Sequence, residues 1–86
     1  MTKVEFSELA NRGIQKEFPE RFRQESCRSS MAFYLRKHHD SHSEICEAFG
    51  DKQMYLYIFG LRWRVLYEVT PTRVLVWSFV PRLLGE

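Results

Sequence analysis

The chain has 86 residues, of which 44% are hydrophobic and 15% aromatic, and its formal net charge is only +2. This is the size of one domain, covering residues 1–86, and it is too apolar for a disordered chain and too weakly charged for a polycation. With no apolar leader and no apolar run approaching the roughly 20 residues of a membrane span, we expect a cytoplasmic protein that does not insert in a membrane and whose Cys27 and Cys46 stay reduced.

The first part of the chain shows a short β-like run followed by two helical patterns. Residues 3–7 predict a strand, and Ser7 is a suitable N-cap for the helix that follows. Gly13 either weakens this helix or lets it pack closely on a neighbour. Pro19 ends the first helix or opens the second, which we expect over about Pro19 to His38.

The second predicted helix is amphipathic. Its apolar side is formed by Phe18, Phe22, Cys27, Met31, Tyr34 and Leu35, and its other side largely by Arg21, Arg28 and Arg36. Cations from Arg36 to His39 mark its C-terminal end, where the helix dipole favours them. After a loop, Ser43–Phe49 has the pattern of one helical turn, which Gly50 breaks.

The last third of the chain contains three β-rich runs: Met54–Phe59, Trp63–Val69 and Arg73–Val80. Very short breaks between them predict an antiparallel meander. In the middle run Arg64 alternates with apolar neighbours, so it faces away from the apolar side. The order of elements predicts an α+β fold, β-α-α-β-β-β, in which two helices cover one face of a three-stranded sheet. The other face is free to meet a ligand or a partner.

Four arginines lie on or beside this predicted sheet: Arg62, Arg64, Arg73 and Arg82. A guanidinium on a rigid sheet suits a phosphate ligand, because its fork matches phosphate oxygens and it stays charged. A plainer interpretation stays open beside this one. In that interpretation Arg64 forms a pair with Glu68 or with a residue of a neighbouring strand, and the other three arginines are solvated charges at loop edges.

The histidines near the end of the second helix invite a metal interpretation, since His38 and His42 are four residues apart, with Asp40 and Cys46 close by. The helix is expected to stop between them, and the sequence contains no second ligand cluster. A solvated helix end is the better account. We therefore expect no metal and no cofactor.

The ordered set of elements resembles the RelE/ParE toxin superfamily of bacterial toxin–antitoxin systems. Residues Val4–Ala10 resemble the family's first strand and helix, and Trp63–Val69 resembles its aromatic-Arg-hydrophobic-hydrophobic-Tyr strand. The run Val74–Phe79, followed by Arg82, fits the last strand and the functional C-terminus. The resemblance covers nearly the whole chain.

The resemblance implies one of two activities. RelE-like members cleave mRNA in the ribosomal A site without a metal, by positioning a 2′-hydroxyl to attack the adjacent phosphate. Arginine and lysine stabilise the charge that builds on that phosphate, and an acid/base group moves protons. ParE-like members share the fold but act on DNA gyrase. Both kinds are held inactive by an antitoxin protein that wraps the toxin.

Carried over by position, Arg64 matches the sheet arginine that contacts the scissile phosphate, and Arg82 matches the basic residue after the last strand. Glu47 stands where some members carry an acidic general base, although a carboxylate in the first turn of a short helix is the commoner explanation. Arg62 and Lys52 are the further candidates for phosphate contact.

Two departures from the family weigh against cleavage. The paired lysines of the first long strand are replaced by Tyr55, Tyr57 and Phe59; a tyrosine there can stack a base, although such rings are more often core residues. The tail after Arg82 has neither the Tyr nor the His that RelE-like nucleases often carry. Three hypotheses remain: a ribosome-dependent endoribonuclease, a non-enzymatic gyrase inhibitor or degenerate antitoxin binder, and a generic RNA-binding protein.

Overall fold

The structure is a computed structural model that describes residues 2–42, 50 and 52–82. The described elements are β1 (Lys3–Phe6), α1 (Glu8–Glu17), α2 (Arg21–His38), β2 (Met54–Phe59), β3 (Trp63–Val69) and β4 (Arg73–Pro81). This order confirms the predicted β-α-α-β-β-β fold. The helical turn expected at Ser43–Phe49 lies outside the described residues.

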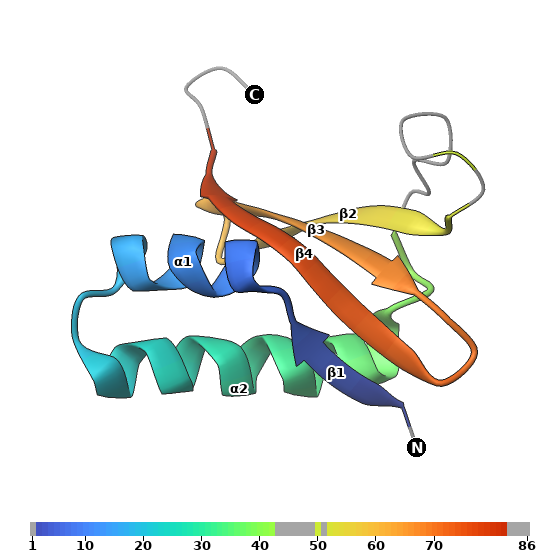
Figure 1. Cartoon of the computed structure of the whole chain (residues 1–86), viewed down its shortest axis with the longest axis horizontal. Helices are drawn as coiled ribbons and strands as arrows, with labels where there is room; N and C mark the ends of the chain where they lie inside the picture. Colours follow the sequence, from blue (N-terminus) through green and yellow to red (C-terminus); the bar gives the residue numbers. More distant parts are fainter. Residues whose placement is uncertain (1, 43–49, 51, 83–86) are drawn as a thin grey trace.

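The strands form one sheet in the order β1-β4-β3-β2 (Figure 1). The meander β2–β3–β4 is antiparallel throughout, as predicted. Strand β1 adds a fourth strand, because it pairs in parallel with β4 from Lys3 opposite Arg73 to Phe6 opposite Val76. The sequence predicted β1 as a strand but gave no partner for it. The first and last strands of the chain therefore lie side by side.

Helix α1 is fixed on β4 at two points. The Ser7 hydroxyl caps the helix by accepting the Ala10 N–H at 3.0 Å, and it donates to the Trp77 carbonyl at 2.7 Å. Gly13 touches β4 directly, because a Cβ built there would lie 2.1 Å from the Phe79 carbonyl oxygen. Of the two roles foreseen for Gly13, close packing is the one that the structure shows.

Helix α2 runs antiparallel to α1 and lies with it on one face of the sheet (Figure 1). It buries Cys27, Met31 and Leu35. Phe22, which was expected on the same side, is 65% exposed. At about 100° of rotation per residue, Phe22 lies about 180° from Met31 around the helix axis, so the expectation for Phe22 was wrong.

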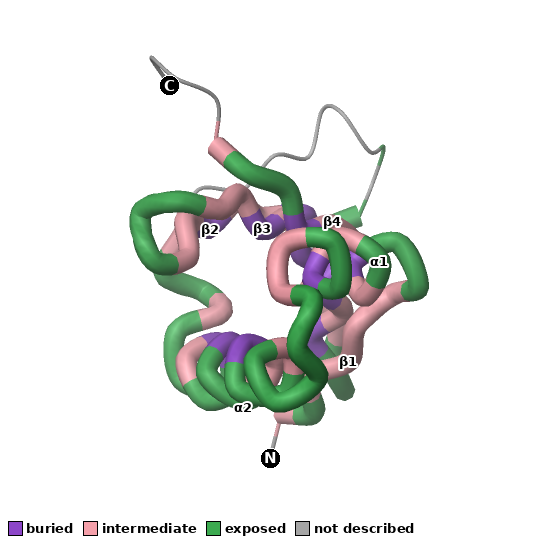
Figure 2. Tube along the Cα trace, turned by 90° about the vertical axis from the view of Figure 1, so that its left-hand side faces the viewer, coloured by how far each residue is buried: buried purple, intermediate pink, exposed green. Residues whose placement is uncertain are grey.

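The core lies between the two helices and the face of the sheet that they cover (Figure 2). Its buried members are Ala10, Ile14, Cys27, Met31, Leu35, Tyr57, Val65, Tyr67, Val74, Val76 and Phe79. An aromatic contact also joins α2 to the sheet, because Tyr34 on α2 stacks on Tyr57 at 4.6 Å between ring centroids. Large rings compensate for the small size of the core, since each buries a large apolar area.

Three residues, 60–62, connect β2 to β3, and the first two have left-handed backbone, Gly60 (φ 59°) and Leu61 (φ 62°). The Arg62 N–H closes the turn on the Phe59 carbonyl at 3.2 Å. Successive positive φ angles are typical of the type I′ turn, whose twist suits an antiparallel hairpin. This turn fixes the register of β3 and hence the place of its arginines.

Candidate phosphate-binding face of the sheet

The face of the sheet that points away from the helices is called the outer face below. Its residues alternate with those of the core cluster, and the strand register places the following described residues on it: Lys3, Glu5, Met54 (only 1% exposed), Leu56, Ile58, Arg64, Leu66, Glu68, Arg73, Leu75, Ser78 and Val80. Trp77 joins them through its hydrogen bond to Glu68. The face therefore combines apolar side chains, one indole and several cations.

Arg64 lies on the outer face, as its alternation with buried residues predicts. It stands opposite Ile58 on β2 and Val80 on β4, and its neighbour Val65 is fully buried on the inner side. Its side chain is partly covered rather than fully exposed. Because it belongs to a strand with a partner on each side, its backbone is held rigidly.

Arg82 lies at the same end of the sheet. Its backbone N–H donates to the Arg62 carbonyl at 2.8 Å, which extends the β3–β4 ladder one step past the Trp63–Pro81 pair. Arg62 is the last residue of the turn before β3 and is two residues from Arg64, so their Cα atoms are at most about 7 Å apart. The structure thus brings the backbones of all three arginines together.

The guanidinium of Arg62 does not point across the outer face. Its central carbon lies 5.5 Å from the centroid of the Trp63 ring, in a cation–π contact. Trp63 belongs to the inner side, where it packs on Phe18 and Phe79 and its indole N–H donates to Glu17 at 2.9 Å. Arg62 therefore lies at the rim of the candidate site.

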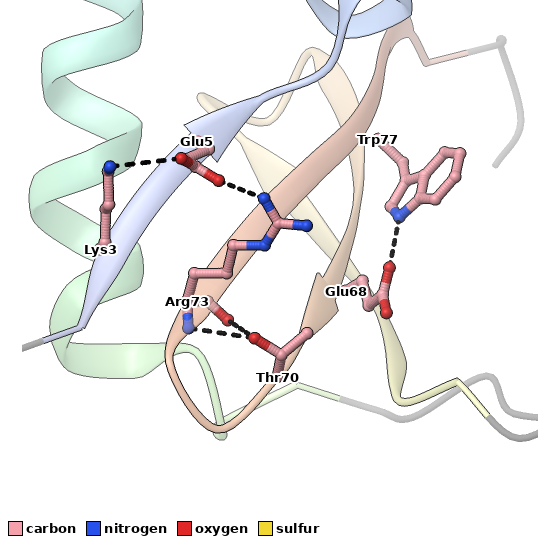
Figure 3. Close-up of polar contacts among 6 residues, drawn as sticks. All are labelled: Lys3, Glu5, Glu68, Thr70, Arg73 and Trp77. Carbon is pink, nitrogen blue, oxygen red and sulfur yellow. Dashed lines mark hydrogen bonds and ion pairs between the residues drawn. The ribbon is translucent and has the colours of Figure 1, made fainter.

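Lys52 is not brought to the arginines. Its ammonium nitrogen lies 4.8 Å from the centroid of the Trp77 ring, and the Trp77 indole N–H donates to Glu68 at 2.9 Å (Figure 3). Glu68 is four residues from Arg64 along β3, a Cα distance of about 13 Å. Lys52 therefore lies toward the opposite end of the outer face from Arg64. The sequence favoured a core or sheet-pair role for Trp77 over a base-stacking one, but Trp77 lies on the outer face, in line with Arg73 and Leu75.

Tyr55 and Tyr57 lie on the inner face of β2. Tyr57 is only 8% exposed, and burial, with the nearby Tyr34 and Cys27, raises the pKa of its hydroxyl to about 12. Tyr55 stacks on Tyr67 at 5.4 Å between ring centroids. A ring packed between a strand and a helix cannot take a base, so we remove Tyr57 from the candidate site, and Tyr55 faces away from Arg64.

Two acidic residues were considered beside the arginines, Glu47 as a general base and Glu68 as a partner for Arg64. Glu47 lies outside the described residues, as does Cys46. Glu68 was considered as a partner for Arg64, but its carboxylate is hydrogen-bonded to Trp77. Within the described part of the chain, the carboxylates on the outer face are those of Glu68 and Glu5.

Arg73 lies on the outer face at the end away from Arg64. It was expected to be a solvated edge residue, but it pairs with Glu5 across the β1–β4 ladder (Figure 3). That hydrogen bond is the main cause that lowers the pKa of Glu5 below 4.5. Arg73 thus helps to join the first and last strands, and its charge is already matched.

The histidines near the end of α2 form part of an aromatic cluster. The His42 Nε2 atom and the Tyr34 hydroxyl are 3.0 Å apart, and the Tyr67 hydroxyl donates to the His39 carbonyl at 2.8 Å. Burial lowers the pKa of His42, and the charge of His38 lowers it further. Among the residues that the structure describes, no group of three or more His, Cys, Asp or Glu is arranged to hold a metal ion. This cluster fastens the end of α2 to the sheet.

Two further observations concern Cys27 and the helices. Burial raises the pKa of the Cys27 thiol to about 11, so Cys27 is a core residue and not a reactive thiolate. Within the described ranges, neither helix is long and apolar enough to cross a membrane.

The chain matches no protein-family model, no curated protein and no solved structure. The resemblance to RelE/ParE toxins therefore rests on the residues and element order of this chain alone.

Proposed function

We propose that this protein is a RelE/ParE-like toxin that cleaves mRNA at the ribosome, with Arg64 and Arg82 contacting the phosphate. The observation that supports the proposal best is the convergence of these arginines at one end of the outer face. Arg64 is held on a central strand, and the last ladder hydrogen bond brings Arg82 next to that strand.

The proposed site would promote cleavage by electrostatic stabilisation. When a ribose 2′-hydroxyl attacks the adjacent phosphate, negative charge builds on the phosphate oxygens. Guanidinium groups aimed at those oxygens stabilise the charge, and they stabilise it most where the surrounding protein is rigid and apolar. Leu66 and Val80 supply apolar neighbours to Arg64 on the outer face. No metal is needed for this step.

An antitoxin is part of the proposal, and the helical side of the molecule offers a surface for it. Phe22 is 65% exposed and borders an open groove of about 410 Å³ whose lining includes Phe18, Phe59 and Trp63. An apolar groove with exposed aromatic residues is typical of a site that a partner protein covers.

Inducible expression in bacteria tests the proposal. We expect the wild-type chain to arrest growth and to produce new mRNA 5′ ends that primer extension detects within translated codons. Arg64→Ala should abolish both effects, while Arg73→Ala should keep them, because Arg73 is at the far end of the face and is paired with Glu5. An Arg64→Ala protein that folds and remains as toxic as the wild type would exclude Arg64 from the site.

One observation favours a second candidate, a ParE-like gyrase inhibitor or a family member that only binds its antitoxin. The described part of the outer face offers cations but neither Tyr nor His as a proton carrier, since Tyr55 and Tyr57 face inward. Binding to gyrase needs no such group. A gyrase supercoiling assay beside a ribosome-dependent cleavage assay separates the two candidates: inhibition of supercoiling without mRNA cleavage would favour the second.

A further inference from the structure

Trp77 is the extra residue of a β-bulge in β4. Leu66 of β3 is opposite Ser78, and the next residue, Tyr67, is opposite Val76, which leaves Trp77 without a cross-strand partner. A bulge changes the direction in which a side chain points. Trp77 continues the outward set of Arg73 and Leu75, because Val74 and Val76 face inward, and the bulge places Ser78 on the outer face as well before Phe79 returns to the inner side.

Two hydrogen bonds, one at the backbone and one at the side chain, fix the orientation of Trp77. Its carbonyl accepts the Ser7 hydroxyl at 2.7 Å, and its indole N–H donates to Glu68 at 2.9 Å (Figure 3). Lys52 lies over the ring, 4.8 Å from its centroid. The other tryptophan, Trp63, is instead packed against Phe79 as part of the inner aromatic cluster. Trp77 is thus a partly exposed aromatic ring in a fixed orientation, with a cation beside it.

The position of Trp77 relative to Arg64 suits a nucleic acid strand. The two residues lie on neighbouring strands and are offset by two to three residues, so their Cα atoms are about 10 Å apart. Along the outer face the order is Arg82 and Arg64, then Trp77, then Lys52. A single-stranded RNA alternates phosphates and bases in the same way.

From this arrangement we infer that Trp77, oriented by Glu68 and flanked by Lys52, is a base-stacking subsite for the single-stranded RNA whose phosphate Arg64 and Arg82 bind. The inference rests on the proposed function and adds to it the residue that holds the base. Stacking on an aromatic side chain is how proteins hold unpaired bases, and it tolerates any base because every base has a π-face.

Charge on the described outer face favours an anionic strand over an apolar protein partner. The cations are Lys3, Lys52, Arg64, Arg73 and Arg82, and the carboxylates are Glu5 and Glu68. Glu5 is matched by Arg73, and Glu68 is engaged by the indole N–H. On the described outer face, cations therefore outnumber carboxylates on both sides of Trp77.

Equilibrium binding of short single-stranded RNA, and of an abasic sugar-phosphate strand of the same length, tests the inference at one fixed salt concentration. Trp77→Ala should weaken binding of the RNA by about 5-fold to 150-fold, the usual effect of removing one stacking ring. Trp77→Phe should restore most of the affinity, because it keeps an aromatic face. Binding of the abasic strand should not change in either variant. Thermal unfolding of each variant verifies that it is folded.

The salt dependence distinguishes the subsite from the phosphate site. Trp77→Ala should leave the slope of log affinity against log salt unchanged, whereas Arg64→Ala should reduce its magnitude by about one. If Trp77→Ala binds RNA as tightly as the wild type while Arg64→Ala still weakens it, the stacking inference is wrong and the proposed function stands. If RNA binding depends on neither residue, both are wrong. Loss of a protein partner in Trp77→Ala, with RNA affinity unchanged, would also overturn the inference.

Discussion

Gly13 is the residue at which helix α1 comes closest to strand β4. A Cβ at this position would lie 2.1 Å from the Phe79 carbonyl oxygen, so any larger residue must push the helix away from the sheet. Gly13→Ala should therefore lower the free energy of unfolding by about 1 kcal/mol or more, although alanine favours a helix by about 1 kcal/mol over glycine. Urea unfolding followed by circular dichroism measures the change.

The control for Gly13 is Gln15→Ala, an exposed position on the same helix, which should change stability by less than about 0.5 kcal/mol. A Gly13→Ala protein more stable than the wild type would show that α1 does not pack on β4 as closely as described.

His42 should make the stability depend on pH. Burial lowers its pKa in the folded chain below the ordinary 6.5, so between the two pKa values the unfolded chain binds more protons. The free energy of unfolding should then fall as the pH is lowered through 6.5 and should be fully recovered above it. Glu5 acts only at more acidic pH, because its pKa is lowered from 4.5.

Melting temperatures measured between about pH 5 and pH 8 check this, since the unperturbed histidine pKa lies in that window. His42→Phe keeps an aromatic ring beside Tyr34 but does not titrate, so its melting temperature should vary less with pH than that of the wild type. An equal dependence on pH in both proteins would assign the effect to another group.

At the scale of the elements, Ser7 links the start of α1 to the bulge in β4. Its hydroxyl both caps the helix and donates to the Trp77 carbonyl, so Ser7→Ala loses two hydrogen bonds at once. We expect the free energy of unfolding to fall by about 2 kcal/mol, roughly the sum of a lost cap and a lost hydrogen bond. Chemical denaturation measures it.

Ser7→Asp offers the sharper comparison, because aspartate caps a helix but has no hydrogen to donate to the Trp77 carbonyl. Its stability should lie between those of the wild type and Ser7→Ala. Ser29→Ala, at an exposed site on α2, should be close to neutral. If Ser7→Asp is as stable as the wild type, the bond to β4 contributes nothing.

The elements themselves were largely readable from the sequence, because helical and strand periodicities differ and Ser7, Pro19, Gly60 and Pro71 mark their ends. What could not be predicted from the sequence was the strand with which β1 pairs. Nothing in Lys3–Phe6 indicates a parallel partner 70 residues away, since parallel pairing is decided by how the helices pack. Phe22 was assigned to the wrong side of α2 for a simpler reason: it lies on the opposite side of the helix axis from the buried residues.

The candidate site was predicted only where alternation alone decides it. Arg64 faces outward because its neighbour Val65 is buried, and period two suffices to predict that. The same reasoning was not applied to Tyr57, whose partner in β3 is Val65 on the inner side. For Trp77 the sequence favoured a core role, although alternation with the inward Val74 and Val76 places it on the outer face.

At the scale of the whole molecule, the sheet separates two surfaces. The helices cover one face and enclose the core (Figures 1 and 2). The outer face carries Arg64 and Trp77, and Arg82 follows at its end. Substitutions on the outer face should therefore change binding and activity more than stability. The groove beside Phe22, which we propose as the antitoxin site, lies on the helical side and is therefore separate from the outer face.

Cleavage of mRNA on purified translating ribosomes tests the central claim most directly. We expect cleavage by the wild-type protein without added cofactor, a loss of about 100-fold to 1000-fold in rate for Arg64→Ala, and a rate near that of the wild type for Arg73→Ala. Equal rates for Arg64→Ala and the wild type, or no cleavage by a folded wild-type protein, would contradict it.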